Sequence, residues 1–292
     1  MQPLTVHRKK PDWLRIRLRT GPGFQHVRRS MRELSLNTVC EEARCPNIYE
    51  CWSDRTATFM ILGDVCTRRC GFCAVASGRP PAGADPAEPA HLAEAVERLG
   101  LKHVVITSVD RDDLPDGGAA HFAAVIRAVK ERVAGCAVEI LTPDFKGIDD
   151  PLTAILDAGP AIFSHNVETV PRLYRTARPG SSYRASLGLL AAAARRGAAR
   201  VKTGIMVGLG ETREEIRRTM RDIRETGTEV MTLGQYLQPT VEHLPVERYV
   251  PPAEFDELRD EGLALGFDHV ESGPLVRSSY HARDHYRSDP VV

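Results

Sequence analysis

The sequence lacks a long hydrophobic run, a hydrophobic N-terminal core and an excess of either charge sign. No apolar stretch approaches the roughly 18 residues that a membrane-spanning helix needs. The first ten residues, MQPLTVHRKK, contain no signal-peptide core, so secretion is not expected. Lysine plus arginine equals aspartate plus glutamate at 39 each, which argues against a bulk nucleic-acid-binding surface. These absences predict a cytoplasmic protein whose partners include neither a membrane nor a nucleic acid.

Seven cysteines are present, and without an export signal they indicate metal or redox chemistry more than disulfides. Six of them form two groups of three between residues 40 and 73. Cys136 stands alone beside a strand-like segment, and we expect it to be a small buried hydrophobic residue.

The central motif consists of Cys66, Cys70 and Cys73, which follow a strand-like run at residues 58–63. Three thiolates on one short loop can converge on a small inorganic core. A closed iron–sulfur or zinc site normally has four protein ligands, so three leave one metal position open to a small molecule. The alternative is a set of structural thiols, or a zinc site completed by a distant fourth ligand.

This C-x₃-C-x₂-C spacing, with Phe72 before the last cysteine, resembles the signature of the radical S-adenosylmethionine (SAM) enzymes. The resemblance implies that Cys66, Cys70 and Cys73 hold a [4Fe–4S] cluster. It also implies that SAM binds the open iron and is split there into a radical that abstracts hydrogen from unreactive C–H bonds. The protein then contributes positioning, exclusion of water and electronic tuning.

A second group, Cys40, Cys45 and Cys51, has x₄ and x₅ spacings, which match neither a zinc finger nor a C-x-x-C redox motif. Alone it is compatible with a redox pair plus a spare thiol. Placed just ahead of the first motif, the block CEEARCPN with Cys51 closely resembles the lipoyl synthase family of radical SAM enzymes. That resemblance implies a second, auxiliary [4Fe–4S] cluster on these three cysteines.

The stretch GPLVRSSYHA at residues 273–282 would by itself be an ordinary surface turn. Beside the two cysteine groups it resembles the C-terminal motif of the same family, in which a serine oxygen is the fourth ligand of the auxiliary cluster. Carried onto this sequence, that ligand is Ser278, with Ser279 as the alternative. Arg277 is a candidate for stabilising the serine oxygen as it leaves the cluster. The resemblance covers residues from about 33 to 282.

From about residue 56 the sequence alternates strand-like and helix-like segments, which implies parallel strands joined by helical crossovers. We expect strands at residues 58–62, 103–108, 137–142, 161–165, 201–207 and 230–236. We expect helices near residues 87–99, 118–134, 149–158, 170–176, 184–196 and 213–226. Six such units predict an α/β fold with an open, partial (β/α)₆ TIM-like barrel.

Three parts are expected: an N-terminal extension (1–55) with the auxiliary cysteines, the partial barrel (56–272), and a C-terminal segment (273–292) with the serine ligand. Residues 1 to about 35 show little periodicity, and a few apolar side chains are expected to anchor them on the body: Trp13, Leu14, Ile16 and Leu18. From Arg283 onward we expect a loosely held polar tail. Thr212 and Glu215 predict a capping box at the start of the last helix, before Ile216.

In such a barrel the chemistry lies at the C-terminal ends of the strands, where several polar stretches occur. We expect Ser108 and Asp110 to contact the methionine or ribose end of SAM, and Asn166 and Glu168 to contact the ribose. Arg178 is expected to pair with the SAM carboxylate through its planar guanidinium. The alternative for each stretch is an ordinary loop with turn and cap residues.

The resemblance implies a sulfurtransferase that inserts two sulfur atoms, at C6 and C8, into an octanoyl chain attached to a lysine of a lipoyl carrier domain. The implied partners are octanoylated E2 subunits and the glycine cleavage H protein, a flavodoxin or ferredoxin as electron donor, and an iron–sulfur carrier that rebuilds the auxiliary cluster. The basic N-terminal arm is a candidate docking surface for the carrier.

Two rival interpretations remain open. One is another radical SAM sulfur-inserting enzyme, such as a biotin-synthase-like enzyme or a methylthiotransferase, although their other cluster ligands or added RNA-binding domain do not appear here. The other is a non-catalytic module with structural zinc in both cysteine groups. The neutral charge and the two incomplete ligand sets argue against it.

Overall fold

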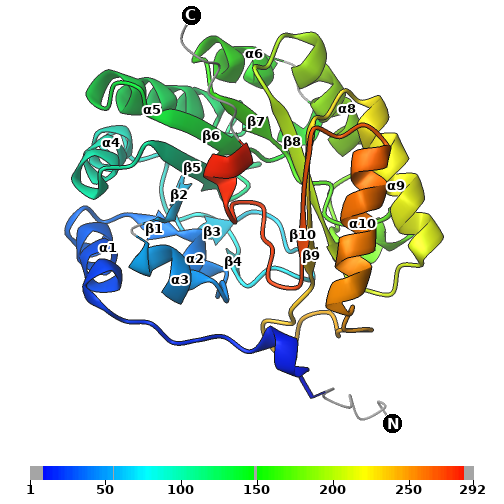
Figure 1. Ribbon diagram of the computed structural model, residues 1–292. Helices are drawn as coiled ribbons and strands as arrows, with labels where there is room; N and C mark the ends of the chain where they lie inside the picture. Colours follow the sequence, from blue (N-terminus) through cyan, green and yellow to red (C-terminus); the bar gives the residue numbers. More distant parts are fainter. Residues whose placement is uncertain (1–8, 55, 148–149, 286–292) are drawn as a thin grey trace, which may run out of the picture.

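Seven parallel strands curve into an open barrel in the computed structural model, which describes residues 9–54, 56–147 and 150–285 (Figure 1). Their order in the sheet is β2, β5, β6, β7, β8, β9, β10. Their bounds are β2 (Thr58–Ile61), β5 (His103–Ser108), β6 (Ala137–Leu141), β7 (Ile162–Ser164), β8 (Val201–Val207), β9 (Val230–Gln235) and β10 (His269–Gly273). The short β1 (Asn37–Thr38) pairs antiparallel with β2, so β1 and β10 are the two edges of the sheet. The predicted α/β fold with a partial barrel is confirmed.

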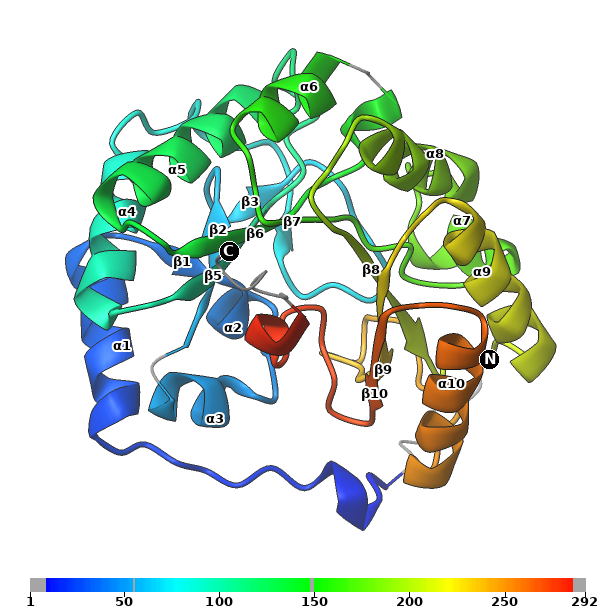
Figure 2. The same cartoon turned by 45° about the horizontal axis from the view of Figure 1, so that its top comes forward.

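Helices cover the outside of the curved sheet (Figures 1 and 2). The main ones are α4 (Glu88–Leu99), α5 (Ala119–Arg132), α6 (Asp150–Asp157), α8 (Tyr183–Arg195), α9 (Arg213–Glu225) and α10 (Pro252–Ala264). The predicted capping box is present, because Thr212 accepts from the Glu215 backbone N–H and the Glu215 side chain accepts from that of Thr212. Ile216, Met220 and Ile223 are buried, as their spacing predicts. Among the described residues, no helix combines the length and the apolar character that a membrane crossing requires.

The six predicted strands are present, but the sequence interpretation missed a seventh parallel unit, α10 with β10. Only Val270 of β10 is fully buried, and the strand reads HVESG, so it lacks the apolar run typical of a parallel strand. The helix expected at residues 170–176 is instead a 3₁₀ turn, η3 (Pro171–Leu173), followed by the short α7 (Tyr174–Ala177). Cys136 is buried, as expected.

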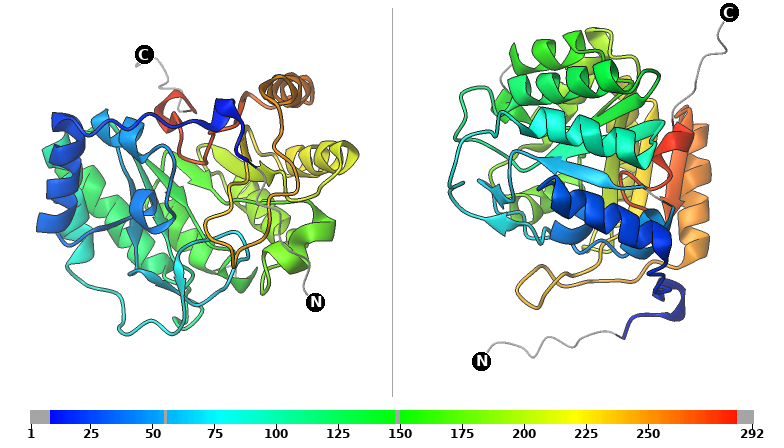
Figure 3. Two further views of the ribbon diagram at one scale, coloured as in Figure 1. Left: turned by 90° about the horizontal axis from the view of Figure 1, so that it is seen from below. Right: turned by 90° about the vertical axis from the view of Figure 1, so that its left-hand side faces the viewer.

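The N-terminal part is more regular than predicted. Helix α1 (Pro22–Glu33) begins at a proline, which suits the first helical position, and it buries Phe24, Val27 and Met31. Before it, the anchoring prediction was wrong for three of the four apolar residues. After the 3₁₀ turn η1 (Asp12–Leu14) the chain is extended and crosses from the α10 side to the α1 side of the molecule (Figures 1, 2 and 3). Only Leu14 is buried, and Trp13, Ile16 and Leu18 are exposed at 43%, 42% and 74%.

After β10 the chain turns back into the ring of strands, where it is red in Figures 1 and 2. A glycine makes room for it, because a Cβ atom at Gly234 would lie 2.1 Å from the carbonyl oxygen of Val276. The segment ends in the 3₁₀ turn η4 (Ala282–His285), which contacts β5. The expected loose tail was therefore wrong at its start, because His285 is buried. Residues 286–292 lie outside the described part.

Candidate cluster and SAM sites

The loop with Cys66, Cys70 and Cys73 leaves the C-terminal end of β2 and is fastened by neighbouring loops. It is bracketed by a two-stranded sheet of β3 (Val65–Cys66) and β4 (Ala76–Ser77). The Thr67 N–H donates to the Asp110 carbonyl at 3.0 Å, and the Gly71 N–H donates to the Ala177 carbonyl at 2.8 Å. His243 Nε2 donates to the Cys73 carbonyl at 2.8 Å. The loop is thus held by the three segments that follow strands β5, β7 and β9.

Arg68, inside this loop, is the centre of a buried ionic network. Its Nε and Nη2 donate to the two carboxylate oxygens of Asp112, each at 2.9 Å. Its Nη2 also lies 2.7 Å from Asp144 Oδ1, and its Nη1 donates to Ser181 Oγ at 2.8 Å. Its Nε is 3.4 Å from Asp110 Oδ1. A single guanidinium therefore fixes the cysteine loop to the segments after β5 and β6 and to the loop before α8.

The three thiols are partly to largely buried. Burial raises the pKa of Cys70 to about 12 and that of Cys73 to about 11, and it also raises the pKa of Cys66. The charge of Arg178 acts in the opposite direction on Cys70. A metal cluster binds thiolate, so binding iron here must displace the protons that burial favours.

Several residues predicted to contact SAM lie around the open side of this loop. The Asp110 N–H donates to Cys66 Sγ at 3.3 Å. Within the described residues, Ser108 Oγ and Asn166 Oδ1 are buried without a hydrogen-bond partner, and Asp110 Oδ1 has no hydrogen bond beyond its ionic contact with Arg68. Buried polar atoms normally have partners, so Ser108 and Asn166 are available to a bound polar ligand. This fits the hydroxyl, amino and carboxylate groups of SAM.

The partly buried Glu168 and the buried Arg178 lie beside Asn166, and their opposite charges influence each other. Arg178 Nη1 donates to the Asn166 carbonyl at 2.9 Å and lies within 3.2 Å of Tyr174 Oη and Ser186 Oγ. Burial raises the pKa of Glu168, and the charge of Arg178 opposes this. The backbone φ of Glu168 is +71°, an uncommon value for a non-glycine residue, and hydrogen bonds to β8 hold it there. Arg178 Nη1 is thus engaged within the protein, although the sequence suggested that Arg178 binds the SAM carboxylate.

The second cysteine group lines a cavity beside the N-terminal end of β2. Cys40 lies in α2 (Val39–Glu42), Cys45 in the following turn, and Cys51 in α3 (Ile48–Ser53). The cavity is lined by Cys40, Cys45, Asn47, Cys51, Thr56, Ala57, Thr58, Arg277, Ser279 and Tyr280. Burial, together with the neighbouring thiolates, raises the pKa of both Cys40 and Cys51 to about 12. Burial also raises the pKa of Cys45, and the charge of Arg277 opposes this rise, as that of Arg178 does for Cys70.

The two serines of the C-terminal segment lie in different environments. Ser279 lines the cysteine cavity, and its Oγ accepts from Thr58 Oγ1 at 2.7 Å. Ser278 Oγ accepts from Asn166 Nδ2 at 2.6 Å. The segment therefore bridges the two sites: Ser279 lies with the second cysteine group, and Ser278 contacts a residue of the SAM side. Arg277 also lines the cysteine cavity.

Sequence reasoning missed several residues that build these sites. Arg68 and Arg69 both lie between the predicted ligands Cys66 and Cys70, so the sequence could not distinguish them. Only Arg68 is buried, and Arg69 is exposed. Asn47, whose side chain donates to the Leu275 carbonyl at 2.7 Å, pins the cysteine cavity to the C-terminal segment. His243 and Thr58 had no local signal, because their partners are far away in the sequence.

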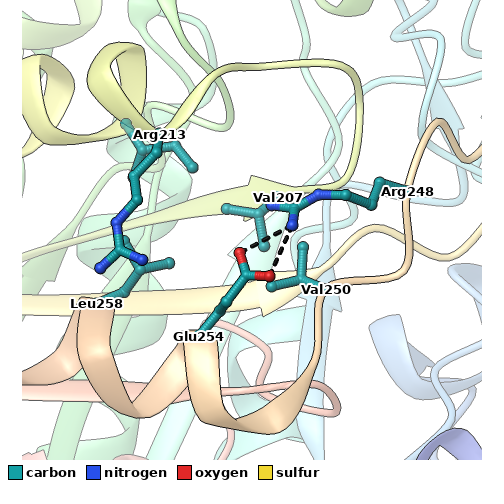
Figure 4. A pocket seen from close by; sticks show the side chains of 7 residues that line it. Val207, Arg213, Arg248, Val250, Glu254 and Leu258 are labelled. Atoms are coloured by element: carbon teal, nitrogen blue, oxygen red, sulfur yellow. Dashed lines mark hydrogen bonds and ion pairs between the residues drawn. The ribbon is translucent and has the colours of Figure 1, made fainter.

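Another small pocket lies outside the barrel, between the end of β8, α9 and the start of α10 (Figure 4). Arg248 Nη1 donates to both carboxylate oxygens of Glu254, at 2.7 and 2.8 Å. Arg213, on its other side, pairs with Glu257 and Glu261. These ionic contacts join the two helices and the intervening loop, so we interpret the pocket as structural.

Comparison with protein families gives two matches along the chain. The family model of the radical SAM superfamily matches residues 60–223, which include the first cysteine loop and most of the barrel. The model of the N-terminal domain of lipoyl synthase matches residues 2–45.

Curated relatives are similar over nearly the whole chain. Lipoyl synthase of Rubrobacter xylanophilus is 59% identical over 94% of this chain and 86% of its own length. Lipoyl synthase of Methylococcus capsulatus is 59% identical over 94% and 85%, and that of Chlorobium phaeovibrioides is 52% identical over 93% and 96%.

Solved structures share the fold at low sequence identity. Methylornithine synthase (PylB) aligns with a TM-score of 0.52 at 16% identity, over 91% of this chain and 88% of that one. HydG, a maturase of the [FeFe]-hydrogenase, aligns with a TM-score of 0.53 at 13% identity, over 79% and 58%. At this identity the comparison supports the barrel architecture alone.

Proposed function

This chain belongs to the lipoyl synthase family of radical SAM enzymes, and from that membership we propose which residues hold each cofactor and how they share the reaction. The enzyme is a sulfurtransferase that uses SAM and two [4Fe–4S] clusters to convert an octanoyl chain on a lipoyl carrier domain into the lipoyl cofactor. The observation that carries the assignment of residues is the position of two cysteine triplets at one barrel, each incomplete as a ligand set.

The chemistry requires a radical because the substrate offers no acidic hydrogen. C6 and C8 of an octanoyl chain are unactivated methylene and methyl carbons, and no side-chain base removes such hydrogens. When bound, the cluster with SAM supplies a radical that abstracts them. We assign the ligands of this cluster to Cys66, Cys70 and Cys73, with the fourth iron position left for SAM.

The residues around this loop bind and orient SAM. Ser108 and Asn166 have buried, unpartnered oxygens available to the polar groups of SAM, and the Asp110 carboxylate, which contacts Arg68, lies beside Cys66. Glu168 is presented by strained backbone, which is typical of a ligand-binding position, and we assign it to the ribose. Arg178 acts as a positioning residue: it holds the Asn166 backbone and favours the Cys70 thiolate by its charge.

The auxiliary cluster, on Cys40, Cys45 and Cys51, is the proposed sulfur donor and is therefore consumed as a substrate. Ser279 is the better candidate for its fourth protein ligand, because its side chain lines the cysteine cavity whereas Ser278 is bonded to Asn166. An alkoxide is a harder ligand than thiolate, which suits a ligand that must be released when sulfur leaves. Arg277, at the same cavity, can donate a hydrogen bond to the released oxygen.

Matched serine variants test this assignment. Ser279→Ala should assemble the auxiliary cluster poorly, so that reconstituted protein holds about half the iron and sulfide of the wild type. Ser278→Ala should retain both clusters. The opposite pattern would assign the ligand to Ser278. Activity is measured with SAM, a reductant and an octanoylated carrier domain, by the mass gain of two sulfur atoms. A protein with both clusters that cleaves SAM without this mass gain would contradict the function.

The electron donor, the iron–sulfur carrier and the docking surface for the carrier domain are also proposals. We assign electron delivery to a flavodoxin or ferredoxin, and rebuilding of the auxiliary cluster to an iron–sulfur carrier. The cytoplasm, where thiols remain reduced, suits the seven free cysteines. For the carrier domain, the exposed Arg15, Arg17 and Arg19 of the N-terminal segment, interleaved with exposed Ile16 and Leu18, form a basic surface suited to an acidic partner.

A further inference from the structure

Histidines and carboxylates from distant parts of the chain meet near the N-terminal ends of the barrel strands. His269 and Glu271 lie on β10, and His285 arrives from η4 at the end of the C-terminal segment. These residues belong to neither cysteine site. One ligand atom from each lies within 4.8 Å of the others. His269 Nε2 is 3.4 Å from Glu271 Oε2, and the rings of His269 and His285 are 4.7 Å apart between centroids.

His285 indicates that this cluster lacks a component. Its side chain is 1% exposed, and among the described residues neither of its ring nitrogens has a hydrogen-bond partner. Burying an imidazole with both nitrogens unpartnered is unfavourable, and native structures seldom leave such groups unsatisfied. A ligand bound between the two histidines and Glu271 would satisfy at least one of these nitrogens.

The surrounding charges are compatible with a cation. Lys202, which is fully buried nearby, is neutralised by Glu139, since its Nζ lies 2.7 Å from Glu139 Oε1. His103 Nε2 is 3.6 Å from the other oxygen of Glu139. His281 Nδ1 is 3.9 Å from Glu271 Oε1 and is half exposed, so it is free to turn away or to act as an additional ligand. The carboxylate of Glu271 thus faces histidines on both sides.

We propose that His269, Glu271 and His285 bind one divalent transition-metal ion of the zinc type, which fastens the end of the C-terminal segment to β10. Two imidazoles and one carboxylate, with an open position, are a ligand set that zinc and related ions accept. Bond lengths of about 2.0–2.2 Å place tetrahedral ligand atoms about 3.3 Å apart. His269 and Glu271 already have this spacing, so His285 needs a small inward movement.

Such a site would act on the segment that carries Ser278 and Ser279. These serines lie between β10 and η4 in the sequence, so a metal joining β10 to η4 closes a loop around them. Closing that loop limits how far the serines move when the auxiliary cluster is dismantled. The ion is therefore a positioning element for the proposed serine ligand and takes no part in the chemistry. This consequence depends on the proposed function, but the metal site does not.

The test uses the anaerobic holoenzyme with both clusters loaded. One equivalent of Zn²⁺ is added, loosely bound metal is removed, and zinc content and the zinc K-edge X-ray absorption spectrum are measured. We expect about one zinc per chain with nitrogen and oxygen ligands at about 2.0–2.2 Å and imidazole scattering. Sulfur ligands at about 2.3 Å would place the zinc at a cysteine site and overturn the proposal, as would a wild type that retains no zinc.

Variants distinguish this site from adventitious binding. Glu271→Gln and His269→Ala remove a ligand at partly exposed positions, and each should weaken zinc binding at least tenfold. They avoid the cavity that His285→Ala would create. His26→Ala, at an exposed histidine of α1, is the matched control and should bind like the wild type. Equal zinc content and spectra in all of these proteins would mean an adventitious ion only. Because the readout is zinc ligation, loss of sulfur-insertion activity would not affect the result.

Discussion

Arg68 and Arg69 are neighbours in the same cysteine loop, yet only Arg68 is buried, which allows a matched experiment. In Arg68→Met the guanidinium that contacts Asp110, Asp112 and Asp144 is removed. In Arg69→Met an exposed charge is lost and no described contact is broken. Both variants replace an arginine with a methionine, at adjacent positions, so only the burial and contacts of the arginine differ.

The expected cost follows from the burial of the partners. The side chains of Arg68 and Asp144 are only 4% and 3% exposed, so Arg68→Met leaves a carboxylate without a counter-charge. Breaking a buried pair in this way costs about 3–5 kcal/mol, a large part of the roughly 5–15 kcal/mol that stabilises a typical domain. Burial by itself would raise the pKa of Asp144, but the hydrogen bond and charge of Arg68 outweigh it and hold that pKa well below its usual range. In the variant this pKa should rise. For Arg69→Met the change should stay within about 0.5 kcal/mol.

Anaerobic urea unfolding of the purified proteins, followed by circular dichroism, measures the stability difference, and iron and sulfide analysis measures the clusters. We expect Arg68→Met to lose the cluster on Cys66, Cys70 and Cys73 first, because its loop is no longer fastened to the segments after β5 and β6. Arg68→Lys should be intermediate, since a single ammonium cannot replace the planar guanidinium at several carboxylates. If Arg68→Met and Arg69→Met unfold at the same urea concentration and hold the same iron, the network does not position the loop.

Three further predictions concern the fold around the sites. Burial and the charge of Arg178 lower the pKa of His165 to about 3, below the ordinary 6.5, so its contribution to stability is present above pH 6.5 and is lost as the pH falls toward 3. Between pH 7 and pH 5 this group should lower the free energy of unfolding of the wild type by about 2 kcal/mol. In urea unfolding at these two pH values, the stability of His165→Asn should therefore fall less than that of the wild type. An equal fall in both proteins would contradict the prediction. Gly234→Ala places a Cβ 2.1 Å from the Val276 carbonyl oxygen, so it should displace the C-terminal segment and reduce auxiliary-cluster iron. Gly188→Ala, at an exposed site within α8, is its control and should keep both clusters while gaining up to about 1 kcal/mol in urea unfolding. Thr212→Ala removes the capping box of α9 and should cost about 1 kcal/mol in the same assay, and an unchanged midpoint would mean that the cap does not stabilise the helix.

The cysteine triplets and the central strands could be predicted because their signals are local. Ligands three to six residues apart must lie near one another, whatever the rest of the chain does. Buried parallel strands such as β2 and β5 contain short apolar runs in the sequence, at residues 59–61 and 104–106. The partial barrel and both candidate cluster sites therefore followed from short stretches read one at a time.

Strand β10 and helix α1 were missed for different reasons. Strand β10 is an edge strand with one fully buried residue, so tertiary contacts with β9 and α10 define it more than its own pattern does, and packing decided its structure against a weak local signal. Helix α1 does have a local signal: it begins at Pro22, and Phe24, Val27 and Met31 have the i, i+3, i+7 spacing of one helix face. The sequence interpretation overlooked that spacing among the charged residues around it.

The sequence by itself determined that two incomplete thiolate sites exist on a barrel, because spacing along the chain is sufficient to bring those ligands together. Only the tertiary structure decided which of two adjacent serines lies with the auxiliary cysteines. Ser278 and Ser279 have the same chemistry, and their separation depends on how one segment enters the barrel: Ser278 meets Asn166, and Ser279 meets Thr58. The grouping of His269, Glu271 and His285 likewise depends on the return of the chain to β10, which no local pattern encodes.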